Sequence, residues 1–358
     1  MKIGILTGGG DCPGLNAVIR GAVKTSVSSY QSEIIGFLHG FKGLIVNKSR
    51  PLGWKDVGGL LPRGGTIIGT SNRDNPFAYS ETVGGKRVVH DVSDRVVETY
   101  KKSSLDALIT IGGDGTLSTA LKLSKKGINI VGVPKTIDND LSATDYTFGF
   151  DTAVNIVTEA IDRLKTTAES HDRVIVLEVM GRDAGWIALF AGLAGGAHII
   201  LIPEIPYDID KVAQKIYERK GKDKHFSIVM VSEGAKPLGG EVTVKRLVDD
   251  PTTAIRLGGV GDHVGSQIEE ITHIDTRVTV LGHIQRGGTP SAFDRILSTR
   301  LGIEAVHMAH RGEFGKMACL RTPNIEAVPL EEAAVTRLVP VDDSRITAAR
   351  SIGISFGD

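Results

Sequence analysis

Residues 107–116 read Ala-Leu-Ile-Thr-Ile-Gly-Gly-Asp-Gly-Thr, a short apolar run that ends in a glycine turn. The run Ala107–Ile111 predicts a buried strand, and the helical spacing of apolar residues from about Leu117 to Lys125 predicts a helix after it. Glycines let the backbone point N–H groups at an anion, and a helix start adds partial positive charge. This order therefore predicts a nucleotide phosphate site. Asp114 either holds Mg²⁺ there or merely caps the helix.

The same alternation of strand and helix runs along most of the chain. Further strands are expected at Ile3–Thr7, Ile34–Leu38, Asn129–Val133, Val174–Val179, His198–Ile202, Ser227–Val231 and Arg277–Leu281. Helices are expected between them, one of them on the apolar stripe from Phe150 to Leu164. This alternation is typical of mostly parallel sheets covered by helices, in which ligands bind beyond the carboxyl ends of the strands. The two halves share this rhythm, which favours two similar domains.

Composition excludes several classes of protein. The 358 residues carry 42 Lys and Arg against 42 Asp and Glu, and no block of like charges stands out, so we expect neither nucleic-acid nor membrane binding. No run reaches the ~18 apolar residues of a spanning helix. Two cysteines exclude a disulfide framework and indicate a cytoplasmic protein. The 44 glycines, about 12% of the chain against a usual ~7%, predict tight turns near a ligand.

Four other loops at strand ends carry residue types suited to phosphoryl transfer: Thr7–Gly14, Pro134–Asp140, Met180–Trp186 and Gly282–Gly288. The first is either a phosphate cradle or a plain glycine-rich turn, and it lacks the Gly-Lys-Ser/Thr of the Walker pattern. In the third, Arg182 is either an anion ligand or a surface arginine. In the fourth, His283 offers a hydrogen-bond donor and Arg286 a bidentate phosphate clamp, although a lone histidine is more often structural.

Pro134–Asp140 is expected to be a polar loop in which two carboxylates, Asp138 and Asp140, lie two residues apart. In an extended stretch both would face the same side. Transfer of a phosphoryl group to a sugar hydroxyl needs one aspartate to accept the hydroxyl proton. The alternative is an ordinary turn built from Asn and Asp residues.

Taken together and in this order, the segments GGDGT, PKTIDND, MGRDAGW and LGHIQRGG resemble the phosphofructokinase family. The resemblance runs from about residue 2 to about residue 300. It implies two similar three-layer α/β/α domains with mostly parallel sheets and the active site in the cleft between them. Residues 1–149 plus about 285–335 would bind the phosphoryl donor, and residues 150–284 plus 336–358 would bind fructose 6-phosphate. The implied reaction is Mg²⁺-dependent phosphorylation of the sugar 1-hydroxyl in glycolysis.

The resemblance also implies roles for individual residues. Asp138 would be the base, with Asp140 beside it and with Thr136 and Arg182 near the transferred phosphoryl group. Asp114 would serve the metal and its phosphates. The other donor-binding residues would be Gly10, Arg73, Gly113, Gly115, Thr116 and Lys135. The other sugar-phosphate ligands would be Met180, Gly181, Glu233, His283 and Arg286, together with Arg173 and Arg277 from a neighbouring subunit. Shared sites of this kind imply a homo-oligomer, most often a tetramer.

Two positions bear on the phosphoryl donor, and they point apart. In the family, glycine at the position of Gly115 accompanies ATP, whereas aspartate there accompanies pyrophosphate, because a carboxylate would crowd and repel the α-phosphate region of ATP. Lysine at the position of Lys135 is found in pyrophosphate enzymes, and many ATP enzymes have glycine there. We expect ATP, because Gly115 removes the block and Lys135 need not prevent ATP from binding.

Three alternatives stay open. The first is the pyrophosphate-dependent version of the same reaction. The second is a non-catalytic regulatory subunit that binds the sugar phosphate, which the presence of Asp114, Asp138, Asp140 and Arg182 disfavours. The third is an NAD or lipid kinase, which GGDGT alone would suggest but in which PKTIDND and LGHIQRGG would have no role.

Overall fold

The larger of two main sheets contains strands from residues 2–149 and a hairpin at residues 316–329. The computed structural model describes residues 1–247 and 255–358, and within them this sheet has the strand order β16-β15-β7-β6-β1-β2-β3, with β8 paired to β7. Its strands are β1 (Lys2–Thr7), β2 (Glu33–Phe37), β3 (Ser49–Leu52), β6 (Ala107–Gly112), β7 (Ile130–Thr136), β8 (Phe148–Gly149), β15 (Lys316–Arg321) and β16 (Asn324–Pro329). The inner strands pair in parallel, whereas β3 and β16 pair antiparallel at the two edges.

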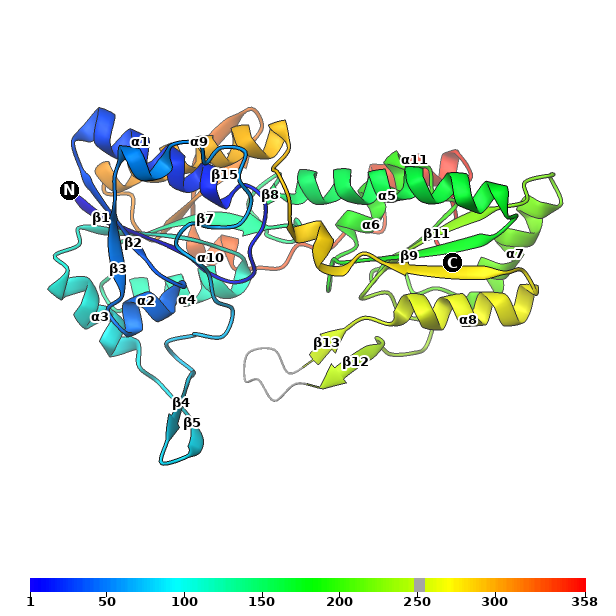
Figure 1. The fold of residues 1–358 in the computed structure, drawn as a ribbon, viewed down its shortest axis with the longest axis horizontal. Coiled ribbons are helices and arrows are strands. Elements are labelled where there is room, and N and C mark those ends of the chain that lie inside the picture. The colour runs from blue at the N-terminus through cyan, green and yellow to red at the C-terminus, as the bar shows by residue number, and fades with distance from the viewer. Residues whose placement is uncertain (248–254) are drawn as a thin grey trace.

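Helices cover both faces of this sheet, as Figure 1 shows. Side chains alternate between the faces along a strand, and Ile109 and Ile111 of β6 join the core under α1 (Leu15–Tyr30) and α9 (Ala292–His310). Leu108 joins the core under α3 (Ser93–Lys102) and α4 (Asp114–Ser124) on the other face. The result is a three-layer α/β/α unit.

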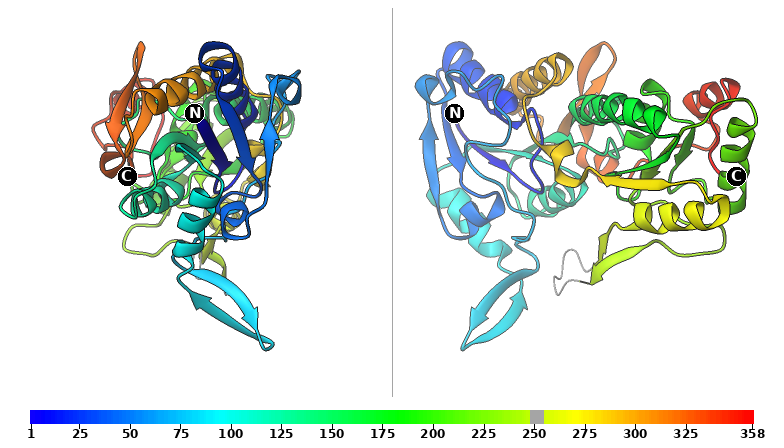
Figure 2. Two further views of the ribbon diagram at one scale, coloured as in Figure 1. Left: turned by 90° about the vertical axis from the view of Figure 1, so that its left-hand side faces the viewer. Right: turned by 45° about the vertical axis from the view of Figure 1, so that its right-hand side comes forward.

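A second sheet has the strand order β10-β11-β9-β14, all in parallel. Its strands are β9 (Val174–Val179), β10 (Ile199–Leu201), β11 (Ser227–Ser232) and β14 (Thr276–Val280). Ile175 and Leu177 face α5 (Phe150–Ser170) and α6 (Trp186–Ala194). Val174 and Val176 face α7 (Ile209–Lys220) and α8 (Val260–Thr272). This second three-layer unit lies beside the first, and the chain termini lie at opposite ends of the molecule (Figures 1 and 2).

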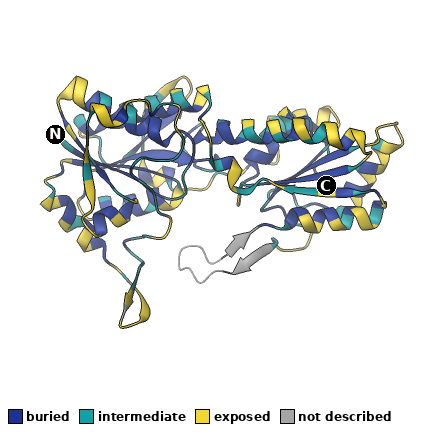
Figure 3. Cartoon of the chain, in the orientation of Figure 1, coloured by how far each residue is buried: buried dark blue, intermediate teal, exposed yellow. Residues whose placement is uncertain are grey.

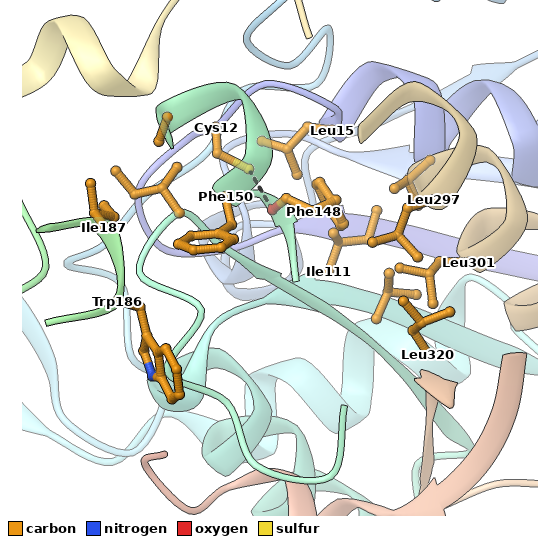
Figure 4. Packing of buried hydrophobic residues seen from close by; sticks show 14 of the residues in the cluster. Cys12, Leu15, Ile111, Phe148, Phe150, Trp186, Ile187, Leu297, Leu301 and Leu320 are labelled. Carbon is orange, nitrogen blue, oxygen red and sulfur yellow. Dashed lines mark hydrogen bonds between the residues drawn. The ribbon is translucent and has the colours of Figure 1, made fainter. Parts of the chain in front are cut away.

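One continuous apolar cluster connects the two units. It contains Ile3 and Ile5 of the large sheet, Phe148 and Phe150 at the crossing, and Ile187 of α6. Figure 4 shows part of this cluster, including the hydrogen bond from the Cys12 thiol to the Phe148 carbonyl at 3.7 Å. Figure 3 shows that buried residues line the strands of both sheets. The loops at the strand ends of the two units are therefore held at a shared junction.

The remaining elements are short. Two hairpins, β4 (Tyr79–Val83) with β5 (Lys86–His90) and β12 (Val244–Leu247) with β13 (Ile255–Leu257), project from the body in Figures 1 and 2. The others are α2 (Phe41–Ile45), α10 (Leu330–Ala333), α11 (Ser344–Ser351) and two 3₁₀ helices, η1 (Trp54–Val57) and η2 (Gly282–Arg286). After α10 the chain crosses to the second unit. There Ser355 forms a parallel β-bridge with Ile199, the first residue of β10.

The structure confirms the expected α/β class and the strands named from the sequence, with bounds that shift by at most three residues. Two boundaries were wrong. Helix α4 begins at Asp114, three residues before the expected start, because Gly113 already serves as its N-cap. Strand β7 runs to Thr136, so Pro134, Lys135 and Thr136 belong to the strand and not to a loop. The proposed domain boundaries stay a prediction.

Both cysteines are buried and unpaired, as the sequence led us to expect. Across the described part of the chain, no helix combines the length and the apolar character that a bilayer crossing demands.

Candidate active site

Two cationic side chains, Lys135 and Arg286, contact the loop after β1. The Lys135 ammonium donates a hydrogen bond to the Gly10 carbonyl at 2.5 Å. The Arg286 guanidinium lies so close to Gly10 that a Cβ atom at this position would collide with it. Burial lowers the pKa of Lys135, which sits inside strand β7. A side chain at position 10 would force the flexible Arg286 guanidinium to move, and the two cationic groups place positive charge against this loop.

A second glycine turn, Gly112–Thr116, packs against the first. The Thr116 side chain fills the space beside Gly112, and a Cβ at Gly8 would lie 2.7 Å from its hydroxyl oxygen. Asp114 and Gly115 occupy the first turn of α4 and are exposed. A Cβ at Gly115 would meet no atom within 4 Å. The two turns thus present a helix start and a glycine with open space in front of it, which suits an incoming phosphate chain.

The loop with the expected donor arginine is tied to the same place. The Gly9 amide donates to the Ser71 carbonyl at 3.0 Å, and the Thr70 hydroxyl donates to the Gly9 carbonyl at 2.6 Å. Arg73 follows two residues later and is exposed, with its own amide bonded to the Ser71 hydroxyl. Arg73 is therefore positioned at the rim of the glycine loops.

Asp138 and Asp140 follow β7, and the pKa of each carboxyl group is raised well above its ordinary value. Burial raises the pKa of Asp138 to about 6, opposed by the nearby Arg286 guanidinium. Burial and the charge of Asp138 raise the pKa of Asp140 to about 7. One carboxylate oxygen of Asp138, Oδ1, is buried without a hydrogen-bond partner in the described structure. A buried carboxylate with one unused oxygen can accept a proton from a bound hydroxyl.

The expectation of an extended stretch at these aspartates was wrong. Asn139 has a φ of 52°, in the left-handed region that asparagine tolerates, so the chain turns between the two carboxylates. Its amide oxygen accepts a hydrogen bond from the Thr147 amide at 3.0 Å, which holds this turn. The Thr136 hydroxyl accepts from the Asp138 amide at 3.1 Å. The two carboxyl groups are electrostatically coupled through this turn and not through a pleated strand.

The donor set for a metal ion is small. No group of three or more His, Cys, Asp or Glu side chains gathers as a metal site within residues 1–247 and 255–358. Mg²⁺ that arrives on a nucleotide needs only one or two carboxylates, because phosphates and water supply its other ligands. Asp114 is exposed at the start of α4, and its charge is one of the influences that raise the pKa of Asp140. These residues fit a metal of that kind.

The second unit brings its own loops to the junction. Gly181 and Arg182 both have positive φ values, 147° and 47°, so the chain turns sharply after β9. The Arg182 amide donates to the Glu233 carboxylate at 3.2 Å, and the Met180 amide donates to the Gln285 side chain at 3.3 Å. Burial raises the pKa of Glu233, which follows β11.

Arg286 and Arg182 are the two side chains of the second unit's loops whose charges lower the pKa of Asp138. The Arg182 side chain is 57% exposed and lies 3.6 Å from Asp183. His283, on η2, is exposed. Arg286 is partly buried, with its Nε unpartnered in the described structure, and its charge acts on both Asp138 and Glu233. Arg286 is thus the side chain that connects the aspartate loop to the second unit.

Arg173 and Arg277 do not join this group. They lie at the starts of β9 and β14. Met180 and Glu233 follow the carboxyl ends of their strands, at the opposite end of the second sheet. Strands of this length separate the two edges by roughly 20 Å at about 3.3 Å per residue. Both arginines pair with Asp275, Arg277 at 2.6 Å. Within one chain, the two arginines therefore lie at the end of the sheet away from Met180 and Glu233.

Sequence reasoning missed several residues that shape the site. Asp275 holds two of the predicted ligands, and the parallel register of β14 and β9 places it beside Arg173. Gln285 holds the Met180 amide from inside a quoted motif. Arg337 binds the carbonyl of Asn139 at 2.9 Å from a C-terminal segment without a recognisable motif. Only the register between β14 and β9, which cannot be read from the sequence, would have indicated that Asp275 lies beside Arg173.

Comparison with known proteins gives a consistent result. The model of the phosphofructokinase family matches residues 2–309. The chain is 53% identical to a Clostridium perfringens protein named ATP-dependent 6-phosphofructokinase 2, over the whole chain and 98% of the relative. It is 51% identical, over the full length of both, to a Streptomyces coelicolor protein named pyrophosphate–fructose 6-phosphate 1-phosphotransferase. Among solved structures, Pichia pastoris phosphofructokinase in the T-state matches with a TM-score of 0.80 and 30% identity, over 98% of this chain and 36% of that one.

Proposed function

The chain belongs to the phosphofructokinase family, and on this premise we propose that it transfers the γ-phosphoryl group of ATP to the 1-hydroxyl of fructose 6-phosphate, giving fructose 1,6-bisphosphate. The observation that carries the proposal is the Asp138 carboxyl group, two residues after the end of β7, whose Oδ1 is shielded from solvent and has no hydrogen-bond partner in the described structure. Two glycine turns suited to phosphate lie on one side of it. Arg286 and the loops of the second unit lie on the other.

Asp138 is the proposed base. Its raised pKa favours proton transfer, because a base works best when its pKa lies near the working pH. The proton of the sugar 1-hydroxyl moves to the free Oδ1 as the hydroxyl oxygen attacks the γ-phosphorus in line with the departing ADP oxygen. In this proposal Arg182 and Thr136 act near the transferred group with Asp140 beside the base, and the charge of Asp138 raises the pKa of Asp140. Cationic side chains stabilise the charge that spreads over the phosphoryl oxygens in the transition state.

The donor side consists of Gly10, Arg73, Gly113, Asp114, Gly115, Thr116 and Lys135. Backbone amides of the two glycine turns and the start of α4 bind the phosphates, and Arg73 reaches them from the rim. Asp114, with Asp140 near it, would hold Mg²⁺ on the phosphates, where the metal neutralises charge. The support for this assignment is the open space in front of Gly115 together with the exposure of Asp114.

ATP is the proposed donor because the chain leaves room for it. Relatives named for ATP and for pyrophosphate are 53% and 51% identical to the chain, so overall identity does not separate the two donors. The open space beside Gly115 supports ATP, since no atom lies within 4 Å of a Cβ built there. Lys135 is engaged with the Gly10 carbonyl and is buried, so its ammonium does not fill the space before Gly115.

The sugar phosphate is proposed to bind to Met180, Gly181, Arg182, Glu233, His283 and Arg286. Arg173 and Arg277 would complete the site from a neighbouring subunit, because they lie at the far edge of their own sheet. The proposed assembly is a homo-oligomer, a tetramer by resemblance to the family. The two unpaired cysteines suit the reducing cytoplasm, which we propose as its location.

Replacement of the base tests the function. Purified wild-type protein should form ADP from ATP only when fructose 6-phosphate is present. Asp138→Ser should lower kcat about 10²- to 10⁴-fold with little change in sugar affinity, because it removes the proton acceptor. The matched control is Asp145→Ser, whose carboxylate binds the Thr322 amide at 2.7 Å and should keep near-normal turnover. Near-normal turnover in Asp138→Ser would refute its role as base.

A further inference from the structure

A short C-terminal segment, residues 335–339, lies along the loop that follows Asp138. The Ser142 amide donates to the Val335 carbonyl at 3.0 Å, and the Arg337 amide donates to the Asp140 carbonyl at 2.7 Å. Leu141 and Thr336 form an antiparallel bridge between these two bonds. The segment therefore pairs with the aspartate loop as a short ladder, although almost 200 residues separate them in sequence.

The Arg337 side chain adds a second set of bonds to the same loop. Nη2 donates to the Asn139 carbonyl at 2.9 Å, and Nη1 donates to the carbonyls of Thr144 at 2.7 Å and Asp145 at 3.1 Å. Together with its amide, Arg337 satisfies four carbonyls at the two ends of residues 139–145. The planar, forked guanidinium can serve three acceptors at fixed directions, which a lysine ammonium on a flexible stem cannot reproduce.

Two of the four carbonyls that Arg337 binds, those of Asn139 and Asp140, come directly after the proposed base. Asn139 turns in the left-handed region, so the directions of its carbonyl and of the next one set how Asp138 and Asp140 are presented. Arg337 is half-buried and burial lowers the pKa of its guanidinium, so its hydrogen bonds to the loop are partly shielded from water. Bonds of this kind are stronger, and more costly to lose, than exposed ones.

The same segment also contacts the loop that carries Arg182. The Trp186 indole N–H donates to the Arg337 carbonyl at 2.9 Å, and the Arg337 guanidinium lies 5.0 Å from the centre of the Trp186 ring. The Glu204 carboxylate accepts from the amides of Val339 at 2.8 Å and Gly185 at 3.0 Å. Trp186 begins α6 directly after the Arg182 turn and marks one end of the apolar cluster in Figure 4.

We propose that Arg337 is a positioning residue for phosphoryl transfer, which holds the Asp138 loop in register with the Arg182 loop. The inference rests on the proposed function, because it assumes that Asp138 and Arg182 act on one phosphoryl group. Misplacing a reacting group by about 1 Å can cost a factor of about 10² in rate. Arg337 touches the loops and not the proposed substrates, so it acts on kcat and leaves substrate affinity nearly unchanged.

The test compares two arginines that stack on the same ring. Arg345 lies 5.1 Å from the Trp186 ring centre, but its guanidinium pairs with Asp343 at 2.7 Å. We expect Arg337→Ala to lower kcat about 10²-fold and Arg337→Lys about 10-fold, with the fructose 6-phosphate KM within about twofold of wild type. Arg345→Ala should keep kcat within about threefold. Millimolar guanidinium should partly restore kcat in Arg337→Ala and leave wild type unchanged.

The possible results separate the inference from the function on which it rests. Wild-type protein without sugar-dependent ATP turnover would overturn the proposed function. Active wild type with an unchanged kcat in Arg337→Lys would overturn the positioning role alone, and this conservative variant decides the matter if Arg337→Ala does not fold. An equal fall in kcat for Arg337→Ala and Arg345→Ala would assign the effect to packing on Trp186 and would also overturn the inference. A raised sugar KM at constant kcat would overturn it too.

Discussion

Asp138 and Asp140 form a coupled pair whose titration should be visible in the reaction rate. Burial raises the pKa of both carboxyl groups, to about 6 and about 7 respectively, so protons bind to the pair well above the usual range of an aspartate. The base must be unprotonated to accept the hydroxyl proton. The rate kcat/KM should therefore fall as pH drops through about 6 to 7, and not near 4.

Asp140→Asn should move this acid limb to lower pH. The substitution removes a neighbouring negative charge, which stabilises the ionised form of Asp138 and lowers its pKa. The measurement is kcat/KM for fructose 6-phosphate from about pH 5 to 9 in wild type and variant, since this ratio reports groups of the free enzyme. An acid limb that stays in place or moves upward would show that Asp140 does not control the base.

Gly115 is the residue at which donor choice is argued. The open space in front of it means that Gly115→Asp should fold normally and should place a carboxylate where the α-phosphate region of ATP is proposed to lie. We expect ATP-dependent kcat/KM to fall much more than any pyrophosphate-dependent rate. Gly115→Ala is the matched control, because it adds a methyl group without charge. Equal losses with both donors would undo the argument from steric block and repulsion.

Close packing of α1 and α9 explains two glycines that have no place in the chemistry. A Cβ at Gly21 would lie 2.7 Å from the Thr299 carbonyl, and one at Gly302 would collide with the Val18 carbonyl. Gly302→Ala should therefore lower the free energy of unfolding by about 1–3 kcal/mol, because rigid backbone must move apart. Gly115→Ala, at an open position in the first turn of α4, should not lower the stability and should raise it by up to about 1 kcal/mol. Urea unfolding measures both, and equal effects would contradict this account of the helix pair.

The sequence predicted elements well where the apolar pattern was continuous. β9 was predicted at its observed bounds, because six apolar or buried residues run between two loops. β3, β15 and β16 were missed, since they lie at or near sheet edges, where alternation with polar residues weakens the signal. The start of α4 was misplaced because glycine and aspartate are weak helix formers, whereas in the structure Gly113 serves as the N-cap of the helix.

The candidate site was predicted as a set of motifs and not as a geometry. The loops after β1, β6, β7, β9, β11 and β14 meet at the junction, as expected for strand ends in open α/β sheets. Two features were not predictable: the contact of Arg286 with Gly10, and the hydrogen bonds of Arg337 to the aspartate loop. Both join parts of the chain more than 190 residues apart, and such pairing depends on how the two units are connected.

At the scale of the whole molecule, the position of Arg173 and Arg277 requires a second copy if they bind the sugar phosphate. Arg277→Ala should raise the fructose 6-phosphate KM strongly and, assayed below that KM, should be nearly inactive, as should Asp138→Ser. Mixed oligomers of the two variants should regain activity, because one type of site then combines an intact Asp138 with an intact Arg277 from its neighbour. Co-expression with two affinity tags and tandem purification isolates these hybrids. Hybrids as inactive as their parents would place both arginines outside the shared site.

A continuous apolar core crosses the junction between the two units. Phe148 and Phe150 link the two sheets in one apolar cluster, so the glycine turns and the Arg182 turn are held by the same packed interior. The C-terminal segment at residues 335–339 adds polar connections between the aspartate loop and the turn that carries Arg182. The phosphoryl donor and the sugar are therefore proposed to meet between two rigid units, with the base at their junction.

The most direct test of this account is the initial rate with fructose 6-phosphate and Mg²⁺, measured in parallel with ATP and with pyrophosphate. We expect rapid formation of fructose 1,6-bisphosphate and ADP with ATP, and a rate at least about tenfold lower with pyrophosphate. Turnover with pyrophosphate alone would contradict it, because Lys135 and not Gly115 would then decide the donor and the step would run in both directions. Turnover with neither donor would contradict the assignment of the chain as an active kinase.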